Sequence, residues 1–326
     1  MSNAFVADHF QSHELARQWL EARRWPEGPI CPHCGVIAHA YATKKAGLYR
    51  CAEPACRKDF SITTGTVMES SHIPLHKWMM AFYLMSSSKK GMSAHQVHRA
   101  LGVSYKAAWF MCHRIREAMR GESPLGFGPL GGKGEIVEAD ETYFGKTEQP
   151  RISPRRKGRP YNPRGSRGPK DKRPIVALVE RGGNVRTFHV PVADKATVSK
   201  IVRENIARES RLHTDESRLY PDVGKLFQAH KTVHHTGGEY VRIEYPITGE
   251  PAESIHTNSA EGYFSIFKRG MRGVYQHCKE KHLHRYLAEF DFRYNHRVGL
   301  GCSDIDRTLA AIKGAEGKRL MWRQPD

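Results

Sequence analysis

Two close pairs of cysteines near the start of the chain restrict its fold more than any other feature of the sequence. Cys31 and Cys34 form the first pair, and Cys51 and Cys56 form the second, with sixteen residues between the pairs. Four thiolates in two such pairs can surround one tetrahedral Zn²⁺, and a module this small takes much of its folding free energy from the metal. We therefore predict a zinc ribbon in residues 1 to 66, with one zinc ion held by these four cysteines.

The zinc itself does not identify a reaction. The chain has seven cysteines, an odd number, and the crowding of four of them into one short segment favours metal binding over disulfide pairing. His33 and His39 lie close to the cysteines and are alternative ligands. We interpret the ion as structural, so the function must be sought elsewhere in the chain.

The charge balance indicates a polyanionic partner. Lysine and arginine total 52 against 34 aspartate and glutamate, which leaves a formal net charge of +18 and a pI near 9.7. Each phosphate that a protein neutralises releases condensed counterions, so such a balance favours nucleic acid. A membrane surface would also attract it, but no apolar run approaches the roughly 18 residues that span a bilayer, and the first residues lack a signal peptide. We expect a cytoplasmic protein with no membrane partner.

Residues 67 to 122 have the pattern of helices. Ser93 and Gln96 have the spacing of a capping box, and a turn at residues 101 to 103 leads to Ser104, an N-cap for a helix that runs to about residue 119. Helix, tight turn and basic helix form the outline of a helix-turn-helix, whose second helix enters the major groove. An ordinary helical hairpin is the alternative. The DNA-binding interpretation assigns contacts to four side chains of the second helix: Lys106, His113, Arg114 and Arg116.

A strand-rich region follows a Gly/Pro-rich linker at residues 123 to 134. Residues 135 to 300 contain three β-rich runs, a segment with apolar residues at helical spacing, another short β-like run and then helices. This order predicts an α/β core in which helices flank a mixed sheet. Residues 301 to 326 remain as a C-terminal tail.

One segment of this region cannot bury apolar surface. Residues 145 to 173 hold eleven lysines and arginines and five prolines, so we predict a loop between the first two strands. The loop leaves the strand that carries the best catalytic candidate, which favours a clamp on DNA phosphates over a merely solvated charged loop. Its candidate DNA contacts are Arg155, Arg156, Lys157 and Arg159.

Acidic residues in unusual positions are the candidates for catalysis. Phosphodiester cleavage by two metal ions needs several carboxylates that converge from different elements. Asp140 lies within an otherwise strand-like run, on the same face as Glu138 by alternation, and Asp215 follows a second short run. A carboxylate in mid-strand is costly to bury unless it binds a cation or is paired. The alternatives are a salt-bridged strand residue for Asp140 and a helix cap for Asp215.

A third carboxylate belongs to a later helix. Glu261, Ser265 and Lys268 lie at i, i+4 and i+7 and share one helical face, which sets an acid and a cation two turns apart. The alternative is a simple capping box formed by Asn258 and Glu261.

Several of these stretches together resemble a known family. They are CPHCG, FSITTGTVMESSHIPLHKW, VEADETYFG, HTDES, HTNSAEGYFSIFKRGMRGVYQH and HRYLAEFDFRYNHR, which span residues 30 to 297. The chain is similar in them to bacterial insertion-sequence transposases that join an N-terminal zinc ribbon to a DDE-type, ribonuclease-H-like domain, in the group named IS fifteen-ninety-five. The last three stretches taken together are specific to this resemblance, whereas a CxxC pair alone is not.

The resemblance implies the remaining roles. The family's first two aspartates fall on Asp140 and Asp215, and its third position falls on Glu261, followed by Lys268, with Asn258 as the alternative. The implied cofactor is Mg²⁺ or Mn²⁺, two ions per site held by the three carboxylates. The implied reaction is cleavage of the element's 3′ ends and their transfer into double-stranded target DNA. Lys268, Arg269 and Arg272 would contact the DNA.

The implied reaction also predicts an oligomeric state and a cellular location. Two element ends must be held together, so we expect at least a homodimer on DNA, in a bacterial cytoplasm and associated with the nucleoid. A non-catalytic DNA-binding regulator or transposase relic is the alternative function, and a nuclease that hydrolyses without joining is a third. Strand-transfer products would separate the nuclease from a transposase.

Overall fold

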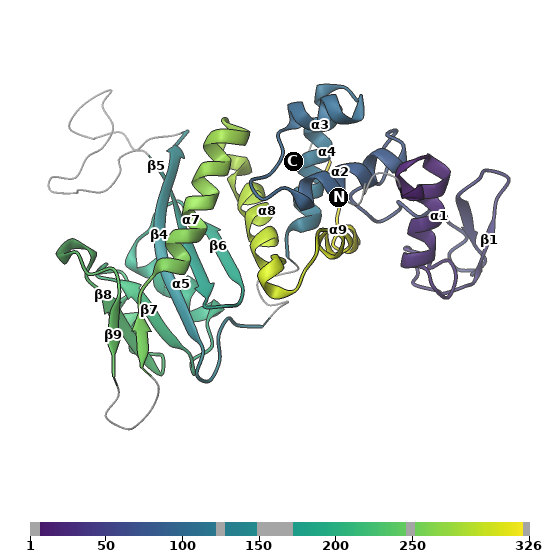
Figure 1. Ribbon diagram of the computed structural model, residues 1–326. Coiled ribbons are helices and arrows are strands. Elements are labelled where there is room, and N and C mark those ends of the chain that lie inside the picture. Colours follow the sequence, from purple (N-terminus) through teal and green to yellow (C-terminus); the bar gives the residue numbers. More distant parts are fainter. Residues whose placement is uncertain (1–6, 122–127, 149–171, 246–251, 322–326) are drawn as a thin grey trace, which may run out of the picture. The chain divides into compact units, whose positions relative to one another are not determined.

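The computed structural model in Figure 1 describes residues 7–121, 128–148, 172–245 and 252–321. The chain divides into two compact units: Met1–Arg120 together with Cys302–Asp326, and Gly121–Gly301. We call the first the ribbon unit and the second the sheet unit. The ribbon unit is discontinuous in sequence, and the sheet unit is inserted between its two parts.

The ribbon unit begins with a helix and a small antiparallel sheet. After the 3₁₀ turn η2 (Asp8–Phe10), helix α1 (His13–Arg24) starts at Ser12, whose side chain accepts a hydrogen bond from the backbone N–H of Leu15. The sheet has the order β1-β2-β3, with strands β1 (Ala40–Ala42), β2 (Leu48–Cys51) and β3 (Asp59–Ser61). Its core is aromatic, since the ring of Trp25 packs edge-on against Tyr49 and Phe60 at centroid distances of 5.5 and 5.8 Å.

Four helices complete the ribbon unit: α2 (Leu75–Ser87), α3 (Ala94–Leu101), α4 (Tyr105–Met119) and α9 (Asp304–Lys313). Ser93 and Gln96 form the predicted capping box, and Ser104 caps α4 as expected. Between them Gly102 adopts φ +59°, a left-handed conformation that favours glycine and allows the tight turn.

The end of the chain is not a separate tail. Helix α9 packs against α2 and α4. The helix ends at Gly314, where a Cβ atom would lie 2.4 Å from the carbonyl oxygen of Ala118, so only glycine allows this approach. Beyond it, the backbone N–H of Val67 donates to Ala315 at 3.1 Å, and that of Gly317 donates to Gly65 at 2.8 Å. The C-terminal segment is therefore part of the ribbon unit, a role that the sequence pattern did not indicate.

The sheet unit is built on five strands in the order β6-β5-β4-β7-β8. The strands are β4 (Ile136–Lys146), β5 (Lys172–Glu180), β6 (Val185–His189), β7 (Arg211–Asp215) and β8 (Ala229–Val233). The first three in sequence pair antiparallel, whereas β7 pairs parallel with both β4 and β8. The mixed sheet is confirmed, and its order and flanking helices are those of the ribonuclease-H-like fold that the resemblance implied.

Both faces of this sheet are covered, which explains why the middle of β5 is continuously apolar. Val176 and Leu178 face one core with helices α5 (Lys195–Asn205) and α6 (Pro221–Gly224). Ala177 and Val179 face the other, with helices α7 (Asn258–Gly270) and α8 (Leu283–Asn295). Figure 1 shows α7 lying across one face of the sheet and α5 behind it.

Smaller elements connect these parts. A two-stranded antiparallel sheet, absent from the sequence-based prediction, comes before α7 and consists of β9 (Arg242–Glu244) and β10 (Glu253–Ile255). The remaining turns are η3 (His235–Gly237), the π-helical η4 (Met271–Tyr275), η5 (Glu280–His282) and η6 (Val298–Leu300).

Candidate active site

The parallel pairing of β4 and β7 brings the two candidate aspartates together. Glu138 is in register with His213, and Ala139 with Thr214. The next residues on the two strands are Asp140 and Asp215, and Asp215 ends β7. Two carboxylates about 75 residues apart in sequence thus lie at neighbouring positions on adjacent strands.

Asp140 occupies an environment that disfavours its charge. Burial raises its pKa to about 8, helped by repulsion from Asp215, Glu141 and Glu261, while one backbone N–H, that of Glu141, donates to its Oδ1 at 2.7 Å. A carboxylate that is desolvated and surrounded by other carboxylates is stabilised by a bound cation. Burial also raises the pKa of Asp215, while a hydrogen bond from the backbone N–H of Ser217 lowers it.

Helix α7 brings the third carboxylate and the lysine to the same place. The helix packs against β4. Glu261 in its first turn is exposed, and its charge contributes to the raised pKa of Asp140. Burial lowers the pKa of Lys268, and the opposing influence of Asp140 is the next largest effect on that lysine. The structure therefore brings Asp140, Asp215, Glu261 and Lys268 into one neighbourhood, beside the point where β7 ends.

The alternative third residue lies at the edge of this group. Asn258 is the first residue of α7 and is exposed, and its backbone N–H donates to Nδ1 of His256 at 3.3 Å. Ser265, on the predicted face between Glu261 and Lys268, is exposed as well.

A fourth carboxylate reaches the site from the opposite face of β4. Glu141 accepts a hydrogen bond of 2.5 Å from the hydroxyl of Tyr220 and one of 3.4 Å from that of Ser217. Burial raises its pKa to about 7, with Asp215 adding repulsion against those bonds. By strand alternation Glu141 lies on the opposite face from Asp140, and the sequence contained no sign that the loop after β7 would enclose it.

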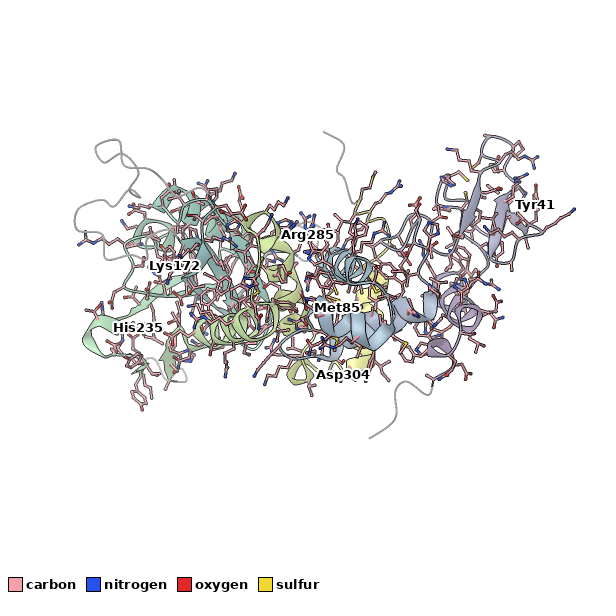
Figure 2. The ribbon with its side chains drawn as sticks, turned by 90° about the horizontal axis from the view of Figure 1, so that it is seen from above. Tyr41, Met85, Lys172, His235, Arg285 and Asp304 are labelled. Atoms are coloured by element: carbon pink, nitrogen blue, oxygen red, sulfur yellow. The ribbon has the colours of Figure 1, made fainter. Side chains whose placement is uncertain are left out.

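A histidine was also missed by the sequence-based prediction. His235, in the turn η3 after β8 (Figure 2), places its Nδ1 3.5 Å from Oε1 of Glu261, and its charge would lower the pKa of Asp215. Tyr240 lies beside it, with the two ring centroids 5.5 Å apart. Only the contact between η3 and the start of α7 reveals this neighbour.

The carboxylate oxygens of this group suit a hard divalent cation such as Mg²⁺ or Mn²⁺. The fit rests on charge and burial: two partly buried aspartates with raised pKa values, side by side, gain from a cation between them.

The ribbon cysteines converge as their spacing predicts. The thiols of Cys31, Cys34, Cys51 and Cys56 all lie within 4.8 Å of one another, and among the described residues no other three His, Cys, Asp or Glu side chains lie this close together, the carboxylates around Asp140 included. Sulfur atoms of Cys31 and Cys56 are 3.8 Å apart, and those of Cys34 and Cys51 are 3.6 Å apart. This arrangement fits a tetrahedral zinc with four thiolate ligands and does not include His33 or His39.

The predicted basic face of α4 is wrong in part. His113 and Arg116 have exposed fractions of 0% and 2%, so neither can reach DNA in this conformation. Arg114 donates to the backbone carbonyls of Glu69 at 3.0 Å and Leu320 at 3.2 Å, which ties three segments of the ribbon unit together. The reason is that α4 is enclosed by α2, α3 and α9, and the apolar stripe alone underestimated how much of the helix is covered.

Other predicted DNA contacts remain on the surface. Lys106 is exposed in the first turn of α4, Arg269 is exposed near the end of α7, and Arg272 is exposed in η4. The four candidates of the basic segment, Arg155, Arg156, Lys157 and Arg159, lie outside the described residues. Among the described helices, none is long and apolar enough to cross a membrane.

Comparison with known proteins bears on both units. Residues 129–295 match the family described as the ISXO2-like transposase domain, and residues 11–59 match the transposase zinc-ribbon domain. An uncharacterized protein in the transposable element ISH50 of Halobacterium salinarum is 30% identical over 299 residues, which cover 87% of this chain and 91% of the relative.

Solved structures show weaker similarity. A pre-cleavage Mos1 transpososome has 12% identity and a TM-score of 0.27, covering 69% of this chain and 75% of that one. A Mos1 transposase paired-end complex with the left transposon end has 11% identity and a TM-score of 0.27, covering 73% of this chain and 78% of that one.

Proposed function

The chain belongs to the family of ISXO2-like transposases, which are DDE-type polynucleotidyl transferases of insertion sequences, and we propose how it acts. It binds the terminal repeats of its element, cleaves the 3′ ends and joins them to target DNA. The observation that carries this proposal is that Asp140, Asp215, Glu261 and Lys268 come from two strands and one helix into one neighbourhood, beside the point where β7 ends.

Asp140, Asp215 and Glu261 would hold two Mg²⁺ or Mn²⁺ ions. When bound, such ions activate the attacking oxygen, first of water and then of the freed 3′-hydroxyl, and stabilise the leaving oxygen. The chain's own contribution is to hold carboxylates at fixed positions, and the raised pKa of Asp140 reflects the cost of doing so, first from burial and then from repulsion by Asp215 and Glu141. The use of divalent metal follows from the family, and the number and identity of the ions are part of the proposal.

Lys268 binds a phosphate of the DNA strand. It lies on the same helical face as Glu261 and is half-buried near Asp140, so its ammonium can contact the phosphate next to the scissile bond. Arg269 and Arg272, exposed on the same part of the chain, extend that contact along the backbone.

DNA binding outside the active site rests on charge. The net charge of +18 favours a long phosphate contact, to which Lys106 and the basic segment with Arg155, Arg156, Lys157 and Arg159 contribute. Because two element ends must react together, the chain acts as a homodimer or larger assembly on DNA.

A mobility assay in cells tests the proposal. A donor plasmid carries this gene with its native flanks, and new insertions are mapped by sequencing for wild type and the variants Asp140→Asn, Asp215→Asn, Glu261→Gln and Asn258→Ala. We expect insertions bounded by short target duplications from wild type and none from either aspartate variant. If Glu261→Gln gives no insertions and Asn258→Ala still gives them, Glu261 is the third carboxylate.

The same assay separates the alternatives. Specific binding to the flanks without insertions from wild type would contradict the proposal and favour a regulator or relic. Cleaved ends in wild-type cells without joined products would favour a nuclease. If Asn258→Ala abolishes insertion and Glu261→Gln does not, Asn258 replaces Glu261 in the site.

A further inference from the structure

The helix that carries Glu261 and Lys268 has no N-cap of its own. Thr257 precedes α7, but its side chain makes no capping hydrogen bond, and its buried hydroxyl has no partner among the described residues. The cap comes from another element. The carboxylate of Glu138 on β4 accepts hydrogen bonds from the backbone N–H groups of Ser259 at 2.8 Å and Ala260 at 3.1 Å, and from the Ser259 hydroxyl at 3.0 Å.

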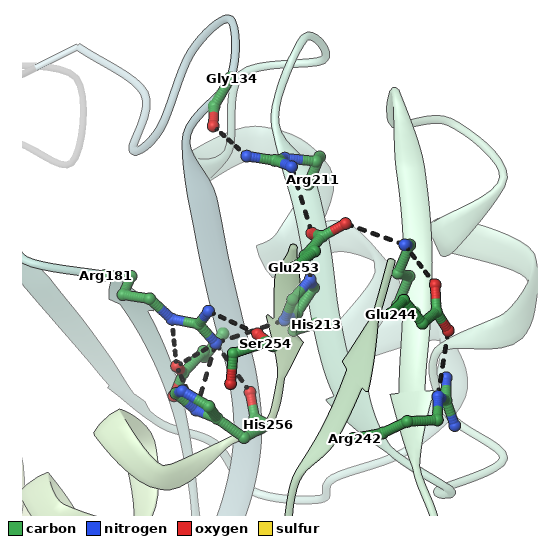
Figure 3. A network of polar contacts seen from close by, with 11 residues as sticks. Gly134, Arg181, Arg211, His213, Arg242, Glu244, Glu253, Ser254 and His256 are labelled. Carbon is green, nitrogen blue, oxygen red and sulfur yellow. Dashed lines mark hydrogen bonds and ion pairs between the residues drawn. The ribbon is translucent and has the colours of Figure 1, made fainter. Parts of the chain in front are cut away.

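This carboxylate is completely buried, so its charge must be compensated. Arg181 donates to Oε1 of Glu138 from Nε at 3.1 Å and from Nη2 at 2.9 Å. The same guanidinium donates to the carbonyls of Ser254 at 2.7 Å and His256 at 3.2 Å, in the segment that enters α7. Figure 3 shows Arg181 lying beside Ser254 and His256. The positive end of the helix dipole adds to this compensation.

The position of Glu138 along β4 makes the contact relevant to catalysis. Glu138 and Asp140 are two residues apart and share one face of the strand. On the helix, the residue after Ala260 is Glu261. The cap that Glu138 provides therefore joins β4 and α7 within two residues of a candidate catalytic carboxylate on each element. Because each residue turns an α-helix by about 100°, a slip of one position would point Glu261 away from Asp140.

We propose that Glu138, paired with Arg181, is a positioning residue that fixes the distance and rotation of α7 relative to β4. It thereby aligns Glu261 and Lys268 with Asp140 and Asp215. The inference rests on the proposed function, since it concerns the alignment of that site. A purely structural role would lower stability without changing metal binding or cleavage by the folded protein.

The same polar network offers a matched control. Glu253 on β10 is 9% exposed, and its carboxylate lies 3.1 Å from Nε2 of His213 and 2.8 Å from Nζ of Lys231. It is a buried, ion-paired carboxylate, like Glu138, but these partners lie on β7 and β8. The nearest link from Glu253 to Arg181 runs through His213, whose Nδ1 lies 3.3 Å from Nη2 of Arg181. Glu253→Gln should therefore cost stability while the hydrogen bonds from Ser259 and Ala260 to Glu138 stay in place.

The test compares Glu138→Gln and Glu253→Gln with wild type in the full-length, zinc-loaded protein. Three quantities are measured: the thermal midpoint, Mn²⁺ binding by electron paramagnetic resonance, and single-turnover cleavage of DNA from the native flanks. We expect Glu138→Gln to weaken Mn²⁺ binding about 10-fold or more, as loss of a group that orients metal ligands does. Cleavage should slow by about 100-fold with DNA affinity unchanged, the cost of a small misplacement. Glu253→Gln should match wild type in both properties.

A double variant, Glu138→Met with Arg181→Met, guards against simple unfolding. It removes both buried charges, so its thermal midpoint should recover while its Mn²⁺ binding stays weak. Recovery of Mn²⁺ binding in the double variant, or equal losses in Glu138→Gln and Glu253→Gln, would overturn the positioning role. If wild type does not cleave its flanks, the proposed function fails, and the Mn²⁺ binding of the variants alone decides the inference.

Discussion

Carboxylates in the interior of the sheet unit differ in their neighbours, and this difference distinguishes groups suited to packing from groups suited to bind a cation. Asp291 on α8 accepts hydrogen bonds from the Tyr263 hydroxyl at 2.6 Å and from the backbone and side chain of Thr187. Asp140 accepts one backbone bond and is surrounded by other carboxylates. A group saturated with donors serves packing, whereas a group left with repulsion is suited to bind a cation.

Asp291 should make stability depend on pH. Burial raises its pKa to about 7, against the hydrogen bonds from Tyr263 and Thr187 that lower it. An acid whose pKa is higher in the folded state costs stability as pH rises from its unfolded pKa to its folded one, here from about 4 to about 7. We expect the stability of Asp291→Asn relative to wild type to be greater at pH 8 than at pH 4. The difference should be at least about 1 kcal/mol, since one unit of pKa corresponds to about 1.4 kcal/mol. Thermal unfolding across this range measures it, and a difference independent of pH would contradict the assignment.

Substitution of Asp140 should raise the stability of the metal-free site and abolish activity. Asp140→Asn removes a charge that is unfavourable in the metal-free protein, so at pH 8 the variant should unfold at a higher temperature than wild type in the presence of a chelator of divalent ions weak enough to leave the zinc. The same variant should not cleave DNA. A lower unfolding temperature would show that the carboxylate is stabilised by groups other than a cation.

At the scale of elements, α4 illustrates how packing decides which residues face solvent. Its first turn is exposed, while His113 and Arg116 are enclosed by α2, α3 and α9. In a helix-turn-helix the first residues of the second helix contact the base edges, so an exposed first turn is compatible with that role.

Two variants of α4 should therefore behave differently. Lys106→Ala should weaken DNA binding and leave the thermal midpoint unchanged, because the side chain is exposed. Arg116→Ala should lower stability by about 1–3 kcal/mol, as removal of a buried polar side chain does, with DNA affinity of the folded fraction unchanged. Thermal unfolding and DNA-binding titrations measure both. Equal DNA affinity in Lys106→Ala and wild type would remove this turn from the interface.

The ribbon should depend on its zinc. With so small a core around Trp25, metal binding supplies on the order of 10 kcal/mol of folding free energy in such modules. We expect Cys51→Ala to reduce the zinc content by one ion per chain, measured by elemental analysis, and to expose Trp25, measured by its fluorescence. Cys278→Ala, outside the cluster, serves as the control and should retain the zinc. An unchanged zinc content in Cys51→Ala would refute the four-cysteine site.

At the scale of the whole molecule, the ribbon unit needs both ends of the chain. Helix α9 packs on α2 and α4, and Arg307 donates to the carbonyl of Ser86 at 3.1 Å. The sheet unit, by contrast, is one continuous segment.

Deletion of residues 302 to 326 should therefore destabilise the ribbon unit and leave the sheet unit folded. We expect unfolding or strong destabilisation of the ribbon unit, since the apolar faces of α2 and α4 lose their cover, while the sheet unit keeps its own transition in calorimetry. A ribbon unit that melts unchanged after the deletion would mean that α9 contributes little to its core.

Features encoded over short stretches could be predicted from the sequence. The zinc ligands follow from cysteine spacing, the caps at Ser93 and Ser104 from residues three positions apart, and the mixed sheet from the succession of apolar runs. Asp140 and Asp215 stood out because acidic residues interrupt strand-like runs, and the family resemblance joined them to Glu261 and Lys268.

What only the tertiary structure decided depends on contacts between distant segments. Glu138 caps a helix that begins about 120 residues later, Glu141 meets Tyr220 in another loop, and His235 reaches Glu261 through a turn with no marked pattern. The burial of His113 and Arg116 likewise depends on helices beyond their own. Local hydrogen bonding and periodicity are set by neighbours in sequence, whereas partners and exposure are set by how the segments pack, which no single stretch encodes.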